Sequence, residues 1–137
     1  MSVVTQSTTP PTVQSIGSPA SAAPAGIVRE SSGPGYCRYE LRAGQQHLSA
    51  AGRVKGAIIY QLIEMTMSEA AGTVADLRKS FFTDAEIRYL QPLNAGTYFC
   101  ETKVLHYSPI HVVLETNVVT EDSLVCVRAS GSFYVRS

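Results

Sequence analysis

Three polar side chains, Gln61, Glu64 and Ser68, recur at helical spacing within an otherwise largely apolar stretch of the chain. Residues three and four apart share one face of a helix, and the small residues Ala57 and Ala71 would complete that face. A helix that covers the core of a small domain has little use for such a face unless it lines a cavity or lies in solvent. In a cavity, the Glu64 carboxylate could act as a general base or a nucleophile; in solvent, it would be an ordinary surface side chain.

The helix that would carry this face is predicted over residues 56–74. Gly56 would open it, so that the Gly56 backbone N–H points out of the positive end of the helix dipole. Such a donor suits an oxygen that becomes negatively charged during acyl transfer, although a glycine here could also serve only a tight turn. Gly72 would end the helix. The apolar stripe on the opposite side consists of Ile59, Leu62, Ile63, Thr66 and Ala70.

The rest of the folded chain has the alternating pattern of strands. Gly131, inside the last of these strands, predicts a bulge or bend. One strand, a long helix and four antiparallel strands form an α+β pattern, in which a curved antiparallel sheet would wrap around the helix. One face or edge of that sheet would stay uncovered, and dimerisation would cover it. The predicted strands span residues 36–43, 83–90, 97–107, 110–120 and 124–136.

The first 35 residues differ in composition from the rest. They hold five of the seven prolines, many Ser and Thr, two charged residues (Arg29 and Glu30) and no aromatic residue. A segment so poor in large apolar side chains cannot offset the entropy lost on ordering. The sequence therefore predicts a disordered Pro/Ser/Thr/Ala-rich tail over residues 1–35 and one folded domain over residues 36–137.

Charge and cysteine content exclude several classes of function. The 11 basic and 11 acidic residues are interspersed and cancel, which argues against a nucleic-acid partner. Cys37, Cys100 and Cys126 form no paired motif, so we expect reduced, mostly buried thiols, no metal site and no cofactor. No apolar run approaches the roughly 20 residues that span a bilayer, and no secretory signal is evident, so a cytoplasmic protein is expected.

Three segments resemble one protein family. His47–Gly72 (HLSAAGRVKGAIIYQLIEMTMSEAAG) is similar to the segment of phenylacetyl-CoA-type and 4-hydroxybenzoyl-CoA-type thioesterases that reads H-x-N-x-x-G-x-x-H-G-G, followed by a helix with Asp or Glu. Residues 87–96 (IRYLQPLNAG) resemble their YL-x-P-x-x-x-G joint, and residues 125–135 resemble their last strand. The resemblance spans residues 36–137 and implies a hotdog fold, in which a curved antiparallel sheet wraps a long central helix.

Carried over residue by residue, the resemblance implies an acyl-thioester hydrolase. Glu64 falls where the family has its catalytic carboxylate, as nucleophile or general base, and Gly56 matches the first glycine of the pair, the oxyanion donor. Ala57 replaces the second glycine, and Lys55 stands where many members have His. Ser49 falls where these enzymes usually carry Asn or Gln, whose amide would orient the carbonyl or the attacking water.

Further candidates concern the substrate. Gln61 and Ser68 would line the site, Lys55 could pair with phosphates of an acyl-CoA or an acyl carrier protein, and Thr83 lies near where some thioesterases place an assisting hydroxyl. His47 and Gly56 also fit the spacing of hotdog dehydratases that act on 3-hydroxyacyl thioesters. In those enzymes the acid position carries Glu, whereas Gln61 cannot donate and recover a proton.

A third reading is a non-catalytic hotdog module that binds acyl groups or serves in assembly, because Ser49 and Ala57 depart from the family pattern. In each reading a homodimer or homotetramer is expected. The acyl group is left open by the sequence: Tyr60, Phe81, Phe82 and Tyr89 could line either an aryl or a fatty-acyl pocket.

Overall fold

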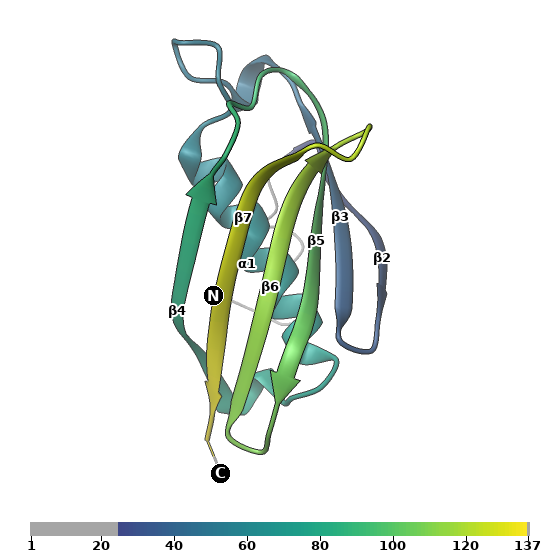
Figure 1. Ribbon diagram of the computed structural model, residues 1–137, viewed down its shortest axis with the longest axis vertical. Helices are drawn as coiled ribbons and strands as arrows, with labels where there is room; N and C mark the ends of the chain where they lie inside the picture. Colours follow the sequence, from purple (N-terminus) through teal and green to yellow (C-terminus); the bar gives the residue numbers. More distant parts are fainter. Residues whose placement is uncertain (1–24, 137) are drawn as a thin grey trace.

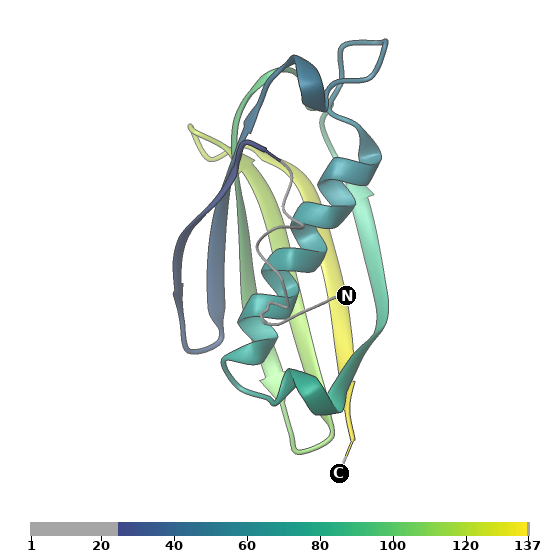
Figure 2. The same ribbon diagram turned by 180° about the vertical axis from the view of Figure 1, so that it is seen from behind.

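The computed structural model describes residues 25–136, in which a six-stranded antiparallel sheet curves around one long helix (Figures 1 and 2). The strand order across the sheet is β2-β3-β5-β6-β7-β4, so β2 and β4 form its edges. This arrangement confirms the predicted α+β architecture. The elements are β2 (Ile27–Gly33), β3 (Tyr36–Ala43), η3 (Gln45–His47), α1 (Gly56–Gly72), η4 (Leu77–Lys79), β4 (Ser80–Tyr89), β5 (Gly96–Tyr107), β6 (His111–Thr120) and β7 (Val125–Val135).

The core lies between α1 and the concave face of the sheet (Figure 2). The apolar stripe predicted for the helix is buried there, since all five of its residues are inaccessible or nearly so. Each fully buried Leu or Ile side chain stabilises the fold by about 1.5–3 kcal/mol, which is what holds the helix across the strands. The facing side chains of the sheet include Leu41, Cys100, Leu114, Val118 and Val127.

Strand β2 corrects the predicted boundary of the folded domain. Residues 27–33 pair with β3 from Ile27 opposite Leu41 to Gly33 opposite Tyr36, so the predicted tail does not extend to residue 35. Ile27 is the one buried side chain of this strand, and the strand therefore lacks the alternating apolar pattern that indicates a half-buried strand. The remainder of the predicted tail, residues 1–24, lies outside the described residues.

One flank of α1 is fastened to the β2–β3 hairpin through Glu69. The Tyr39 hydroxyl donates a 2.9 Å hydrogen bond to one Glu69 carboxylate oxygen, and Arg29 forms an ion pair with the other. Burial and the neighbouring Glu69 charge raise the pKa of the Tyr39 hydroxyl, which keeps it a hydrogen-bond donor. This flank of the helix is therefore closed by polar contacts.

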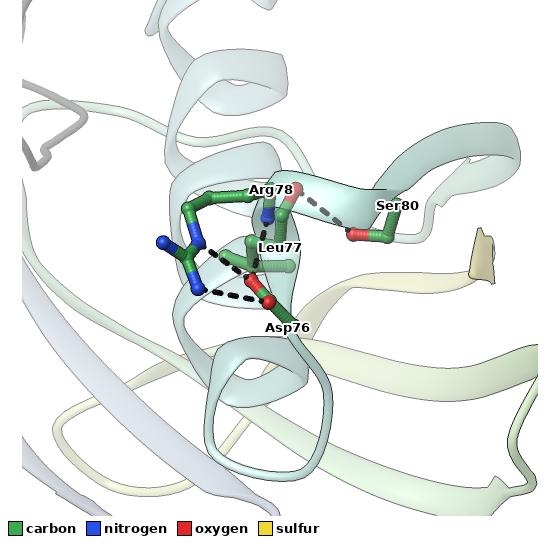
Figure 3. Close-up of polar contacts among 4 residues, drawn as sticks. All are labelled: Asp76, Leu77, Arg78 and Ser80. Carbon is green, nitrogen blue, oxygen red and sulfur yellow. Dashed lines mark hydrogen bonds and ion pairs between the residues drawn. The ribbon is translucent and has the colours of Figure 1, made fainter. Parts of the chain in front are cut away.

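The other end of the helix is linked to β4 by a short capped turn (Figure 3). The Asp76 carboxylate accepts a 3.0 Å hydrogen bond from the Arg78 backbone N–H and pairs with the Arg78 guanidinium at 3.1 Å. The Ser80 hydroxyl donates to the Leu77 carbonyl at 3.3 Å. Because this turn ends at residue 79, β4 begins at Ser80, three residues before the predicted start.

Gly131 has a different role from the predicted bulge. Strand β7 is regular at Gly131: its own irregularity lies between Val125 and Val127, opposite Val118 and Val119 of β6, and the one near Gly131 falls on β4, between Phe82 and Asp84. A methyl group on Gly131 would lie 2.8 Å from the Met67 sulfur and 3.2 Å from the Asp84 carbonyl oxygen. The glycine therefore permits a close approach of α1 and β4 to β7.

Candidate active site

Glu64 lies in the third turn of α1, on a side of the helix that the sheet leaves open. Glu64 and Ala57 are exposed, and Gln61 and Ser68 are half-buried. Partial desolvation by the surrounding protein raises the pKa of the Glu64 carboxyl above its ordinary value of 4.5. A carboxylate that is accessible yet partly desolvated is more basic than a fully solvated one, which suits proton abstraction or attack on a carbonyl carbon.

Ala71 does not belong to this open face. It is fully buried, contrary to the sequence prediction. Ala71 follows Met67 by four residues and so shares its side of the helix, and Met67 packs against β7. The open face therefore ends at Ser68.

Among the described residues 25–136, the Gly56 N–H in the first turn of α1 has no hydrogen-bond partner. Lys55 occupies the N-cap position but its side chain makes no capping hydrogen bond. The first N–H groups of a helix have no partner within the helix, so the Gly56 N–H is available to an acceptor in front of it. Gly56 is exposed, and both the dipole and the free N–H favour a negatively charged oxygen at this position.

Strand β4 ends beside this first turn (Figures 1 and 2). A methyl group on Gly56 would lie 3.9 Å from the hydroxyl oxygen of Tyr89, the last residue of β4. A shallow open pocket adjoins the two elements, lined by Arg53, Val54 and Tyr89–Leu93. The turn after β4 is fixed to the loop before α1, because the Val54 N–H donates to the Leu93 carbonyl at 2.8 Å.

Ser49 is held in a tight loop ahead of the helix. The Ser49 N–H donates to the Arg53 carbonyl at 2.7 Å, and the Gly52 N–H donates to the Ser49 carbonyl at 2.9 Å. Its hydroxyl oxygen accepts a 3.2 Å hydrogen bond from the Ala51 N–H. Gly52 has a φ of 78°, which only glycine adopts without strain, so this turn depends on it. The Ser49 hydroxyl oxygen is thus an acceptor within its own loop.

His47 is buried, with 1% of its surface accessible, and both ring nitrogens contact backbone. The Gly44 N–H donates to Nδ1 at 3.0 Å, so the proton resides on Nε2, which contacts the Ala25 carbonyl oxygen. In this arrangement the ring joins the start of the described chain to the turn before α1. Neither ring nitrogen faces a substrate.

The remaining predicted residues are spread around the domain. Lys55 is exposed at the start of α1, and its backbone N–H donates to the His47 carbonyl at 2.9 Å. Thr83 sits at the irregularity of β4, where its hydroxyl contacts the Ser132 hydroxyl at 2.8 Å and the Ser132 carbonyl at 3.0 Å. Thr83 is therefore tied to β7, whereas Gln61 and Ser68 do share the open face with Glu64.

A helical rise of about 1.5 Å per residue puts Gly56 and Glu64 about 12 Å apart along the axis of α1.

Within residues 25–136, no three His, Cys, Asp or Glu side chains come together as a metal site would require. The three cysteines are buried and unbridged, as predicted. In the same part of the chain, no helix is long and apolar enough to cross a membrane.

Residues 51–127, more than half of the chain, match the family model described as the thioesterase superfamily. The chain belongs to the thioesterase superfamily. Among the predicted site residues of this thioesterase-superfamily protein, Gly56, Glu64 and Thr83 fall inside the matched segment, whereas His47 and Ser49 precede it.

Known proteins resemble the chain over most of its length. A candidate esterase of Saccharolobus solfataricus is 28% identical over 96 residues, which cover 70% of this chain and 69% of the relative. The PaaI protein of Escherichia coli, from the phenylacetic acid degradation operon, superposes with a TM-score of 0.77 at 18% identity, covering 86% of this chain and 83% of its own. A conserved protein of Pseudomonas aeruginosa superposes with a TM-score of 0.74 at 22% identity, covering 80% of this chain and 88% of its own. These likenesses confirm the predicted hotdog fold.

Proposed function

We propose that the protein hydrolyses acyl thioesters, of coenzyme A or of an acyl carrier protein, with Glu64 as the catalytic carboxylate. The observation that carries this proposal is the environment of Glu64: an accessible carboxyl with a raised pKa, on the same helix as the free Gly56 N–H. Membership of the thioesterase superfamily supports the reaction class.

Two chemical routes use these groups. As a general base, the Glu64 carboxylate takes a proton from water while the water oxygen bonds to the thioester carbonyl carbon. As a nucleophile, it bonds to that carbon itself, and water then cleaves the resulting anhydride. In both routes the carbonyl oxygen becomes an oxyanion, which accepts a hydrogen bond from the Gly56 N–H. Collapse of this oxyanion breaks the C–S bond in both routes, and the thiolate leaves and takes up a proton. In the nucleophilic route this step forms the anhydride, before water cleaves it.

We further propose that two copies of the chain complete the site. A carbonyl oxygen bonded to the Gly56 N–H puts its carbon within about 4 Å of that nitrogen. Glu64 of the same chain starts about 12 Å away along the helix. Two antiparallel α1 helices related by a two-fold axis near Tyr60 would bring Glu64 of the partner subunit level with Gly56. The free edge of β4 and the exposed Tyr60 on α1 favour such a pairing.

The other predicted residues have supporting roles in this scheme. Gln61 and Ser68 would line the acyl pocket beside Glu64, and Lys55, with Arg53, would face substrate phosphates at the mouth of the site. The bonds that Ser49, Thr83 and His47 already make argue for structural roles. The buried ring of His47 also argues against the dehydratase alternative, which needs an accessible histidine.

The test is hydrolysis of a panel of aryl-CoA and fatty acyl-CoA thioesters, followed by thiol release. Glu64→Gln keeps the size of the side chain and removes the carboxylate, so we expect the rate to fall on the order of 100- to 10,000-fold. The matched control is Glu86→Gln, because Glu86 is exposed on β4 and lies outside the proposed site. Full turnover by the Glu64→Gln variant would refute the proposed role of Glu64.

The non-catalytic acyl-binding module is a second candidate, and one observation favours it. The Ser49 hydroxyl, at the position of the usual amide, is engaged within its own turn. In that case the wild-type protein would bind acyl-CoA in calorimetry but release no thiol from any member of the panel.

A further inference from the structure

We propose that Tyr89 is an additional catalytic residue of this site, whose phenol hydroxyl donates a second hydrogen bond to the thioester carbonyl oxygen beside the Gly56 N–H. This inference rests on the proposed function. The sequence marks Tyr89 as an aromatic pocket residue at most, because Tyr89 and Gly56 are far apart in the chain and belong to different elements.

The position of the hydroxyl is the first support. The Tyr89 hydroxyl oxygen lies 3.9 Å from where a methyl group on Gly56 would be. That methyl position is about 2.5 Å from the Gly56 nitrogen, so the hydroxyl and the N–H nitrogen are at most about 6.4 Å apart. An oxygen that accepts from both donors at ordinary distances can span up to about 5.6 Å. When the donors approach along the two lone-pair directions of the oxygen, about 120° apart, the span is about 4.9 Å, so one carbonyl oxygen can meet both donors after the Tyr89 hydroxyl moves by at most about 1.5 Å.

The surroundings of the ring are the second support. Tyr89 pairs with Val127, whose side chain is buried beneath α1, so Tyr89 lies on the concave face of the sheet. Its side chain is nevertheless 54% exposed, at the open pocket lined by Arg53 and by residues 90–93. Within residues 25–136 the Tyr89 hydroxyl has no hydrogen-bond partner. A large side chain held at a pocket with a free donor is available to a ligand rather than to the fold.

The third support is the side chain at position 49, which leaves a hydrogen bond for the Tyr89 hydroxyl to supply. Residue 49 is a serine and has no amide to orient the carbonyl, and its hydroxyl oxygen accepts the Ala51 N–H within its own turn. A phenol is protonated at neutral pH and donates a hydrogen bond. A second donor aimed at the developing oxyanion lowers the barrier because its bond strengthens as the charge grows.

The test is the substitution Tyr89→Phe, which keeps the ring and removes the hydroxyl. If Tyr89 stabilises the oxyanion, kcat for thioester hydrolysis should fall on the order of 100- to 1,000-fold while KM changes little. The matched control is Tyr134→Phe. Tyr134 is also exposed, but it lies on the opposite face of the sheet, where the centroid of its ring is 5.5 Å from that of the Phe81 ring. We expect wild-type kcat for this control.

The outcomes separate this inference from the proposed function. Wild-type kcat in Tyr89→Phe, together with an inactive Glu64→Gln variant, overturns the inference alone. An increase in KM with unchanged kcat also overturns it, since it assigns Tyr89 to ground-state binding. A wild-type protein that hydrolyses no thioester overturns both. Calorimetry with a ketone analogue, in which a methylene replaces the thioester sulfur, should give Tyr89→Phe a wild-type Kd within a few-fold. Loss of that binding would mean that the pocket itself had changed and would contradict the proposed role.

Discussion

A buried pair of threonines allows a quantitative test of the packing between β5 and β6. Thr102 and Thr116 lie opposite each other on the concave face of the sheet, and their hydroxyl oxygens are 2.7 Å apart. Their accessible fractions are 0% and 1%. Each hydroxyl therefore depends on the other for its hydrogen bond, because water does not reach either.

Replacing one threonine by valine preserves shape and leaves the other hydroxyl buried without its partner. We expect Thr102→Val and Thr116→Val each to lower the free energy of unfolding by about 1–3 kcal/mol, the cost of an unsatisfied buried polar group. Replacing both removes the unsatisfied group as well, so the double variant should lie within about 1 kcal/mol of the wild type.

Urea unfolding of the four proteins, followed by circular dichroism, gives the three free-energy differences and hence the coupling between the two sites. The expected signature is a double variant that is more stable than either single variant. If the two single effects are small and add to the effect of the double variant, the two hydroxyls do not depend on each other and the reasoning is wrong.

Two other variants follow from contacts described above. Gly131→Ala would put a methyl group against the Met67 sulfur and the Asp84 carbonyl oxygen, so it should lower the free energy of unfolding by about 1–3 kcal/mol. The control is Gly33→Ala, whose methyl group meets open space and should change the free energy of unfolding by no more than about 0.5 kcal/mol. Equal denaturant midpoints for the two variants would contradict the close approach at Gly131. The raised pKa of Glu64 predicts that kcat/KM rises with pH through a value above 4.5, and a midpoint at or below 4.5 would count against it. The pH dependence of stability has the opposite sign to that of kcat/KM. Folding raises the pKa of the Glu64 carboxyl, so the folded state binds protons more tightly than the unfolded state. As the pH rises through the same interval, the wild type should therefore lose thermal stability relative to Glu64→Gln.

The sequence predicted those elements whose side chains alternate between two environments. Strand β3 was predicted with its observed ends. Strands β5 and β6 differ from the prediction by one residue at their first end only, and β7 by one residue at each end. Strand β2 was missed because its position depends on backbone pairing with β3 and on the contact of Arg29 with Glu69. Neither contact leaves a pattern in the sequence of the strand itself.

The site was predictable only in part, for a related reason. The spacing of Gly56 and Glu64 along one helix is visible in the sequence because helical geometry is regular. The positions of Ser49 and His47 depend on which backbone groups close their loops, and residue types alone do not determine this. The approach of Tyr89 to Gly56 joins two elements that meet only after the sheet has curved around the helix.

The sparse anchoring of β2 also divides the domain by local stability. With one buried side chain, this strand adds little hydrophobic free energy. Its other attachments are backbone pairing to β3 and two ion pairs, Arg29–Glu69 and Glu30–Arg38, which are partly exposed and so weakened by salt. Opening of β2 should therefore cost far less than global unfolding, so that its amide hydrogens exchange with solvent before those of the central strands. Strand β4, at the opposite edge of the sheet, has no fully buried side chain, so its amide hydrogens should also exchange before those of the central strands, and the proposed active site borders this second labile edge.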